Sequence, residues 1–342
     1  MKIKAPLTHQ NEVQFLCDAG ADEFFCGIEP GAWRTQYENF CINQRVGSAN
    51  FSKLGDLEKA IRIAHQNKAK VHVTVNAFFY LEKQYSAAKN IIRDALGAGA
   101  DGIIIADFGL LSLMDKNLLK GKDVVAGCDT AVFNHQSTAF YKKFDVTRIV
   151  FPRAMTIGEM EDVIKQDGSL EYEAFILHDL CFFVDAFCAY CKESSAGIKQ
   201  EGKEKKGVSF FAAARVPARG FGGGCRSRFS RQRVYLRGKK KSTPGKAFTF
   251  WGSKAALGCG ACAIYDLNRI GVTCLKVLDR NLPTEEKVKA TAFIKKCLDF
   301  LNGHTSKQHF ISRCQALFKK TFKVRCDRYG CYYPSVFRSG ER

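Results

Sequence analysis

The sequence predicts an α/β protein with a TIM-barrel-like (β/α)8 fold. Amphipathic helical segments alternate with short apolar runs, glycine turns join several of these pairs, and the runs number roughly eight or nine. Strands that helices cover on both faces have this uninterrupted apolar character. The 342 residues suffice for such a barrel, and neither a dinucleotide-binding nor a P-loop glycine motif is present to favour an open doubly wound sheet.

The alternation can be followed in order along the chain. Helical periodicity covers Asn11–Ala19, Leu57–Ala64, Ala87–Leu96 and Tyr265–Ile270. Short apolar runs are the strand candidates, at Ile3, Phe24–Ile28, Val71–Val75, Ile103–Ile105, Val124–Val125, Arg148–Phe151, Ala174–Leu177, Ala247–Phe250 and Cys274–Val277. The pattern stops near Thr305. We therefore expect a barrel domain over residues 1–304 and a short C-terminal extension over 305–342, basic and cysteine-containing, that packs on it.

Polar side chains follow several of the predicted strands directly. In (β/α)8 barrels the active site lies where the strands end and the next loops begin. Asn76, Asp107, Arg153 and His178 occupy such positions and are our candidate catalytic residues. Amide, carboxylate and guanidinium groups at these positions could orient an anionic or hydroxylated substrate. The alternative interpretation is that each residue only forms hydrogen bonds within the barrel rim. A wider set shares the rim: Cys26, Glu29, Cys128, Asp129 and Asp179.

Three cysteine clusters lie in the second half of the chain, around Cys181–Cys191, at Gly222-Gly-Gly-Cys225 and at Gly258-Cys-Gly-Ala-Cys262. Thiolates from separated segments are what an iron–sulfur or soft-metal site needs, and a barrel rim brings such segments together. Zinc is the competing occupant, because four thiolates also form a closed tetrahedral site. The remaining alternative is that cysteines pack as small apolar residues, as we expect for Cys17, Cys274 and Cys297.

The net charge of +19 is concentrated in one segment. Residues 199–246 hold fifteen Lys or Arg and two acidic residues, which gives +13. We interpret the segment as a basic insertion suited to RNA, another anionic substrate or an acidic partner, with a merely solvated loop as the alternative.

No secretory signal or membrane span is recognisable in the sequence, and fifteen cysteines cannot all form disulfides. We therefore expect a cytoplasmic protein with reduced thiols.

Six segments follow one another in a characteristic order: Gly20–Gly27, Ala64–Asn76, Ala100–Gly109, Arg148–Arg153, Glu173–Cys181 with Cys188, and Ile270–Val277 with Arg280. Over roughly residues 3–282 they together resemble the collagenase-like peptidase family U32. The family includes presumed proteases and oxygen-independent hydroxylases of RNA bases or ubiquinone precursors. The resemblance implies a [4Fe-4S] cluster, held by position by Cys181, Cys188, Cys225 and Cys259. Cys262 competes with Cys259 as the fourth ligand, and Cys41 is the reserve.

Three functions are consistent with these features. We favour an iron–sulfur enzyme that carries out oxygen-independent hydroxylation or a related modification of a small molecule or RNA, alone or with a second family subunit. A peptidase is the second, although His-Glu-x-x-His and Gly-x-Ser-x-Gly motifs are missing from the sequence. The third is an RNA- or partner-binding protein in which the cluster is structural.

Overall fold

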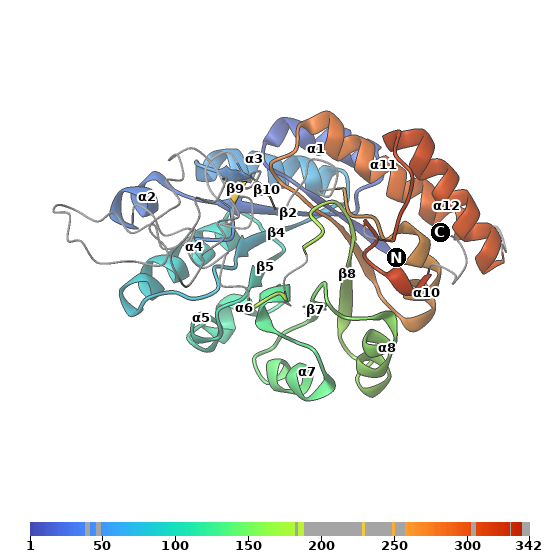
Figure 1. Ribbon diagram of the computed structural model, residues 1–342. Coiled ribbons are helices and arrows are strands. Elements are labelled where there is room, and N and C mark those ends of the chain that lie inside the picture. Colours follow the sequence, from blue (N-terminus) through green and yellow to red (C-terminus); the bar gives the residue numbers. More distant parts are fainter. Residues whose placement is uncertain are drawn as a thin grey trace, which may run out of the picture.

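The computed structural model describes residues 1–37, 42–45, 49–181, 184–187, 257–301, 306–328 and 330–336, together with the backbone of residues 228–229 and 248–249. Its centre is a closed barrel of parallel strands, ordered β1-β11-β8-β7-β6-β5-β4-β2 and closed by pairing of β1 with β2 (Figure 1). The barrel strands are β1 (Lys2–Pro6), β2 (Glu23–Ile28), β4 (Lys70–Val75), β5 (Gly102–Ile105), β6 (Asp123–Ala126), β7 (Arg148–Val150), β8 (Glu171–Leu177) and β11 (Cys274–Val277). The predicted fold is therefore confirmed.

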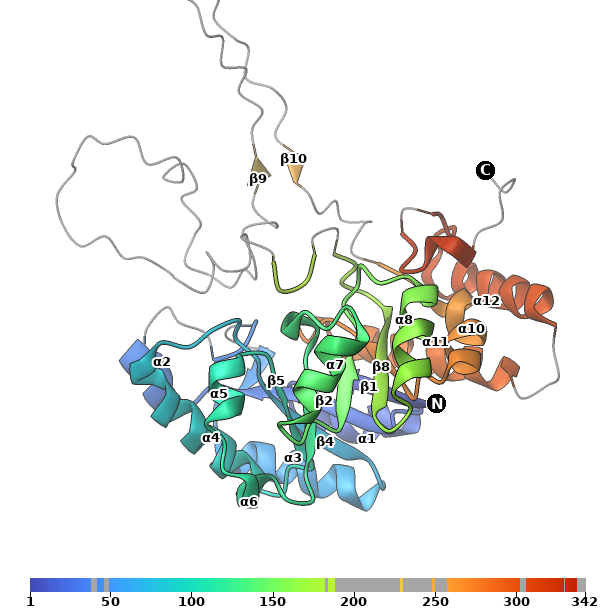
Figure 2. The same ribbon diagram turned by 90° about the horizontal axis from the view of Figure 1, so that it is seen from below.

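The barrel strands coincide with the apolar runs of the sequence, because both faces of each strand are buried. A short strand, β3 (Asn50–Phe51), extends the sheet beside β2. The candidate strand Ala247–Phe250 has a different place. Its core forms β10 (Phe248–Thr249), which pairs antiparallel with β9 (Arg228–Phe229) in a separate two-stranded sheet (Figure 2).

Helices surround the barrel and bury one stripe each (Figure 1). They are α1 (Val13–Asp18), α2 (Gly31–Tyr37), α3 (Leu54–Gln66), α4 (Tyr85–Gly97), α5 (Phe108–Ser112), α6 (Lys116–Leu119), α7 (His135–Lys142), α8 (Ile157–Gln166), α10 (Ile264–Ile270), α11 (Thr284–Leu301) and α12 (Lys307–Phe322). Helix α3 is an example of such a buried stripe. Its buried residues Leu57, Ala60, Ile61 and Ala64 have the spacing of one helical face. Within the described residues, no helix has the length and apolar character required to cross a membrane.

The C-terminal extension lies against the barrel domain. Helix α12 packs beside α11, with the rings of Phe318 and Phe293 5.8 Å apart (Figure 1). The following segment returns to the barrel, where the Tyr333 hydroxyl donates a 2.8 Å hydrogen bond to the backbone carbonyl of Phe175 in β8. Residues more than 150 positions apart in sequence thus share one end of the barrel.

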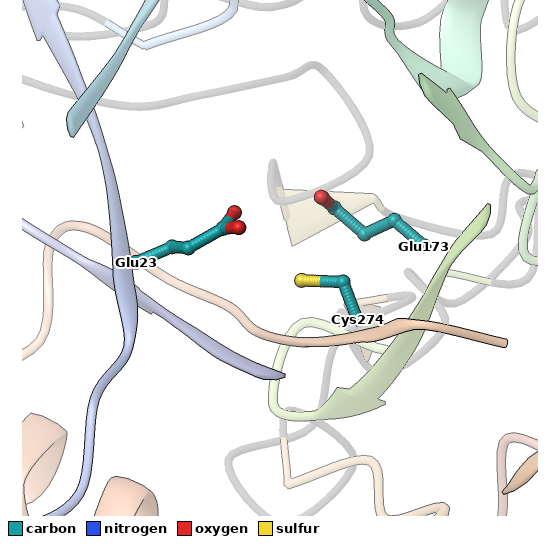
Figure 3. A group of neighbouring side chains, drawn as sticks. All are labelled: Glu23, Glu173 and Cys274. Atoms are coloured by element: carbon teal, nitrogen blue, oxygen red, sulfur yellow. The ribbon is translucent and has the colours of Figure 1, made fainter. Parts of the chain in front are cut away.

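The opposite end of the barrel interior contains a layer of buried charges. Glu23 and Glu173 face each other there, beside Cys274 (Figure 3). Arg148 binds both carboxylates, at 2.8 Å from Nη2 to Glu23 Oε1 and 3.2 Å from Nη1 to Glu173 Oε2, and Lys4 Nζ lies 2.6 Å from Glu173 Oε2. Burial would raise the pKa of Glu23, but the hydrogen bonds from Arg148 together with the charges of Arg148 and Lys4 outweigh burial and lower that pKa. Side-chain cations therefore neutralise this carboxylate pair.

Candidate functional site

The carboxyl ends of the barrel strands surround a pocket of about 60 Å³. Asn76, Cys128 and Arg153 line it from the residues that follow β4, β6 and β7. Asp179 and Arg280 line it from the residues after β8 and β11. The pocket therefore occupies the position at which barrels of this class build their active sites.

Arg280 brings an uncompensated positive charge to the pocket. Its guanidinium donates hydrogen bonds to uncharged acceptors: Asn43 Oδ1 at 2.9 Å, Asn50 Oδ1 at 3.0 Å and Thr74 Oγ1 at 3.2 Å. Gly27 makes room for it, because a Cβ there would lie 2.3 Å from Arg280 Nη1. Burial, and then the charge of Arg45, lower the pKa of Arg280 to about 9. An anionic ligand beside Arg280 would stabilise its charged form.

Lys276 and Arg45 add two more cations to the pocket lining. Burial lowers the pKa of Lys276, although Glu173 lies 2.8 Å from its Nζ and acts in the opposite direction. Arg45 reaches across the pocket to Asp179, with Nη2 2.5 Å from Oδ2. The lining thus contains the four cations Arg45, Arg153, Lys276 and Arg280 but only two carboxylates, those of Asp179 and Asp279, which favours a negatively charged ligand.

Arg153 is held from three sides. Its backbone N–H donates to Asp185 Oδ2 at 2.7 Å, and its Nη1 forms a short ion pair with the same carboxylate. Asp179 lies 3.7 Å from Nη2, and the ring centroid of Phe175 lies 4.3 Å from the guanidinium carbon. Burial alone would lower the pKa of Arg153, but the charges of Asp185, Asp179 and other neighbouring groups together outweigh burial and raise this pKa. Arg153 therefore stays charged at the pocket wall.

Two buried polar atoms at this pocket lack a partner among the described residues: Arg153 Nε, a donor, and Asn76 Oδ1, an acceptor. A buried polar group without a hydrogen bond costs about 1–3 kcal/mol. A ligand with both a donor and an acceptor would satisfy the two atoms at once.

A second polar group lies beside the pocket. Ligand atoms of Cys128, Asp129 and Asp185 fall within 4.8 Å of one another. The Cys128 thiol donates to Asp129 Oδ2 at 3.3 Å, and Gln44 bonds the same oxygen. Burial, and then the charge of Asp185, raise the pKa of Asp129. Asp129 therefore binds a proton more readily than an exposed aspartate does.

The structure separates the four candidate catalytic residues into two groups. Asn76 and Arg153 line the pocket, whereas Asp107 accepts bonds from the N–H groups of Leu110 and Tyr80 at the start of α5. The ring of His178 packs edge-on against Phe322 of α12, 6.2 Å between centroids, and its Nε2 is buried without a partner among the described residues. Burial lowers the pKa of His178.

The predicted cluster ligands are described in part. Cys181 is half-buried and follows β8 by four residues. Cys259 forms an isolated bridge with Leu177, so it reaches the same strand end, and Cys262 is buried near it at the start of α10. Cys188, Cys225 and the reserve Cys41 lie outside the described residues, as do the side chains of the basic insertion 199–246.

Sequence reasoning did not select Arg45, Asp185 or Lys276. Lys276 stands inside an apolar strand, where a lysine is rarely buried without a partner. This unusual position was the sequence feature that could have indicated its role. Arg45 and Asp185 lie in loops with no periodic pattern, so only the tertiary structure reveals their role.

The chain is similar to several known proteins. A model of the family described as peptidase family U32 matches residues 8–333. An uncharacterized protease of Methanocaldococcus jannaschii is 28% identical over 192 residues, 55% of this chain and 43% of the relative. tRNA hydroxylation protein P1 of Bacillus subtilis is 22% identical over 195 residues, 57% of this chain and 43% of the relative. The chain thus spans less than half the length of these two relatives.

Two further matches were found. The 23S rRNA 5-hydroxycytidine C2501 synthase of Escherichia coli is 25% identical over 166 residues, 48% of this chain and 24% of the relative. A solved U32 peptidase superimposes with a TM-score of 0.44 at 11% identity, covering 83% of this chain and 94% of that one.

Proposed function

Because the chain belongs to peptidase family U32, we propose that it is an iron–sulfur enzyme that hydroxylates, or modifies in a related way, an RNA nucleotide at the carboxyl rim of its barrel. The observation that carries this proposal is the cation-rich pocket, in which Arg280 is held by uncharged acceptors and Arg153 Nε is unsatisfied. Phosphate and base edges supply the negative charge and the acceptors that such a pocket lacks. Relatives named for hydroxylation of tRNA and rRNA support an RNA substrate.

The residues at the rim are compatible with a [4Fe-4S] cluster. Cys181 and Cys259 both approach the end of β8, and thiolates are the donors that such clusters require. Cys181, Cys188 and Cys225 would supply three ligands. The fourth would be Cys259, Cys262 or Cys41. Gln44 and Arg45, close to Cys41 in sequence, contact Asp129 and Asp179 at this same rim.

A bound cluster would supply one-electron or Lewis-acid chemistry at the rim. The described residues bind and orient the substrate. Arg280 and Arg153 would hold the phosphate or an acidic base edge, and Asn76 Oδ1 would accept a hydrogen bond from an exocyclic amine. Asp129, whose pKa is raised by burial and by Asp185, would keep a proton available beside the pocket.

Metal analysis tests this proposal. After anaerobic purification we expect iron and acid-labile sulfide in the full chain and the broad visible absorption of a cluster. The change Cys181→Ser should remove most of the iron, whereas Cys297→Ser, at a fully buried thiol between helices, should leave it unchanged. A colourless protein without iron, or equal iron in both variants, contradicts the proposal.

RNA binding is a separate measurement. We expect bulk tRNA to bind, and its affinity to fall steeply as salt rises, because Lys and Arg contacts release counterions from phosphates. Iron-loaded protein that shows no binding at low salt would point to a small-molecule substrate instead.

A further inference from the structure

Two cysteine pairs meet where the C-terminal extension returns to the barrel. One pair, Cys259 and Cys262, has two intervening residues and stands at the start of α10, while Cys326 and Cys331 follow α12 with four between them. Spacings of two to four residues are typical of the paired ligands in structural zinc sites. More than 60 residues separate the two pairs in sequence.

Backbone pairing joins the two segments. Cys259 and Cys331 form an isolated parallel bridge, with hydrogen bonds from Cys259 N to Gly330 O at 2.9 Å and from Tyr332 N to Cys259 O at 3.0 Å. Residues paired in this way direct their side chains to the same face. The two thiols therefore project from neighbouring strands to one side.

The packing around Cys259 fixes the position of its segment. A Cβ on Gly258 would lie 2.4 Å from Leu180 Cβ, and one on Gly260 would lie 2.8 Å from the Tyr333 ring. Glycines on both sides of Cys259 are therefore needed for this close approach.

The thiols also contact one another. The thiols of Cys262 and Cys326 lie within hydrogen-bonding contact, and Cys259 lies close to Cys326 and Cys331. Cys259, Cys262 and Cys331 are each at most 5% exposed. Neighbouring buried thiols of this kind are the ligand set that a thiophilic cation such as zinc binds as thiolates.

Ordinary packing accounts for the other buried thiols nearby. Cys297 and Cys314 hydrogen-bond each other between α11 and α12 and also lie close to Cys259 and Cys262. Both stand on apolar helix faces, where cysteines pack as small apolar residues. The four cysteines above differ, because they stand on turns and short segments and come in pairs at ligand spacing.

We propose that Cys259, Cys262, Cys326 and Cys331 bind a zinc ion that fastens the C-terminal extension to the barrel. Each thiol releases its proton to solvent as its sulfur ligates the ion. No three of these four described sulfurs lie within 4.8 Å of one another, so zinc binding would require the sulfurs to move closer together. It also assigns Cys259 to zinc, which leaves Cys41 as the fourth ligand of the rim cluster.

The test is metal analysis of the full chain, purified anaerobically, by mass spectrometry. We expect stoichiometric zinc in the parent protein, in Cys297→Ser and in Cys181→Ser, and a loss of at least about tenfold in Cys326→Ser and Cys331→Ser. Protein produced with cobalt should show thiolate-to-cobalt charge transfer and the visible bands of a tetrahedral site, both lost in Cys326→Ser.

Two readouts separate this site from the rim cluster and from misfolding. Cys181→Ser should lose iron and keep zinc, whereas Cys326→Ser should lose zinc and keep iron. Removing zinc with a chelator should speed amide exchange in residues 330–336 and leave β4 and β5 protected. Zinc absent from the parent protein, zinc retained in the Cys326→Ser/Cys331→Ser double variant, both metals lost together, or a native Cys262–Cys326 disulfide would each overturn the proposal.

Discussion

Replacing Arg148 with Met should destabilise the barrel by about 3 kcal/mol. The Arg148 side chain is 1% exposed and bonds Glu23, Glu171 and Glu173. Removing one partner of a buried ion pair typically costs about 3–5 kcal/mol, because the remaining charge is left buried. The carboxylates keep other cations here: Lys4 lies 3.2 Å from Glu23 and 2.6 Å from Glu173. We therefore expect the lower end of that range.

Urea unfolding followed by circular dichroism measures this loss, and the thermal midpoint should fall by roughly 4–6 °C. The matched control is Arg269→Met, because Arg269 is half-exposed and pairs with Glu161 at 3.0 Å on the surface. Such pairs contribute about 0–1 kcal/mol. A loss below about 1 kcal/mol for Arg148→Met, equal to that of the control, would refute the view that the buried charges depend on Arg148.

Three further outcomes are expected. Arg153→Met should weaken tRNA binding at least about tenfold and Arg269→Met should not, as fluorescence anisotropy would show; equal affinities would remove Arg153 from the binding site. Burial lowers the pKa values of His72 and His178 from 6.5, so unfolding takes up protons and stability falls as the pH drops below about 6.5; urea midpoints that stay constant between neutral pH and pH ~5 would contradict this. Tyr333→Phe should cost about 1 kcal/mol in urea unfolding, because it removes a buried hydrogen bond to β8; no change would mean that this contact is not stabilising.

The barrel was predictable because its strands are buried on both faces, which leaves a clear apolar signal in the sequence. The charged layer was not, because Arg148 and Glu23 lie 125 residues apart and nothing local pairs them. The position of the C-terminal cysteines was not predictable either. The cysteines were recognised in the sequence, but their proximity to Cys259 and Cys262 depends on how α12 packs against the barrel.

Part of the pocket lining was predictable. The carboxyl rim, Asn76 and Arg153 follow from the position of residues after strands, and both line the pocket. His178 occupies an equivalent position, yet its φ of 64° and that of Asp179 at 47° turn the chain sharply after β8. The His178 ring therefore meets α12, whereas Asp179 lines the pocket. A local pattern cannot indicate such a left-handed pair in residues that are not glycine.

That turn has a consequence for the order in which the molecule assembles. Left-handed conformations in residues other than glycine cost about 1–2 kcal/mol each. Here the His178 N–H bonds Gly258 O at 2.8 Å, and the Tyr332 hydroxyl bonds the His178 carbonyl. Both partners come later in the chain. During synthesis, the strands up to β8 would therefore be available before the partners that fix the loop after β8. The carboxyl end of the barrel would reach its final conformation last.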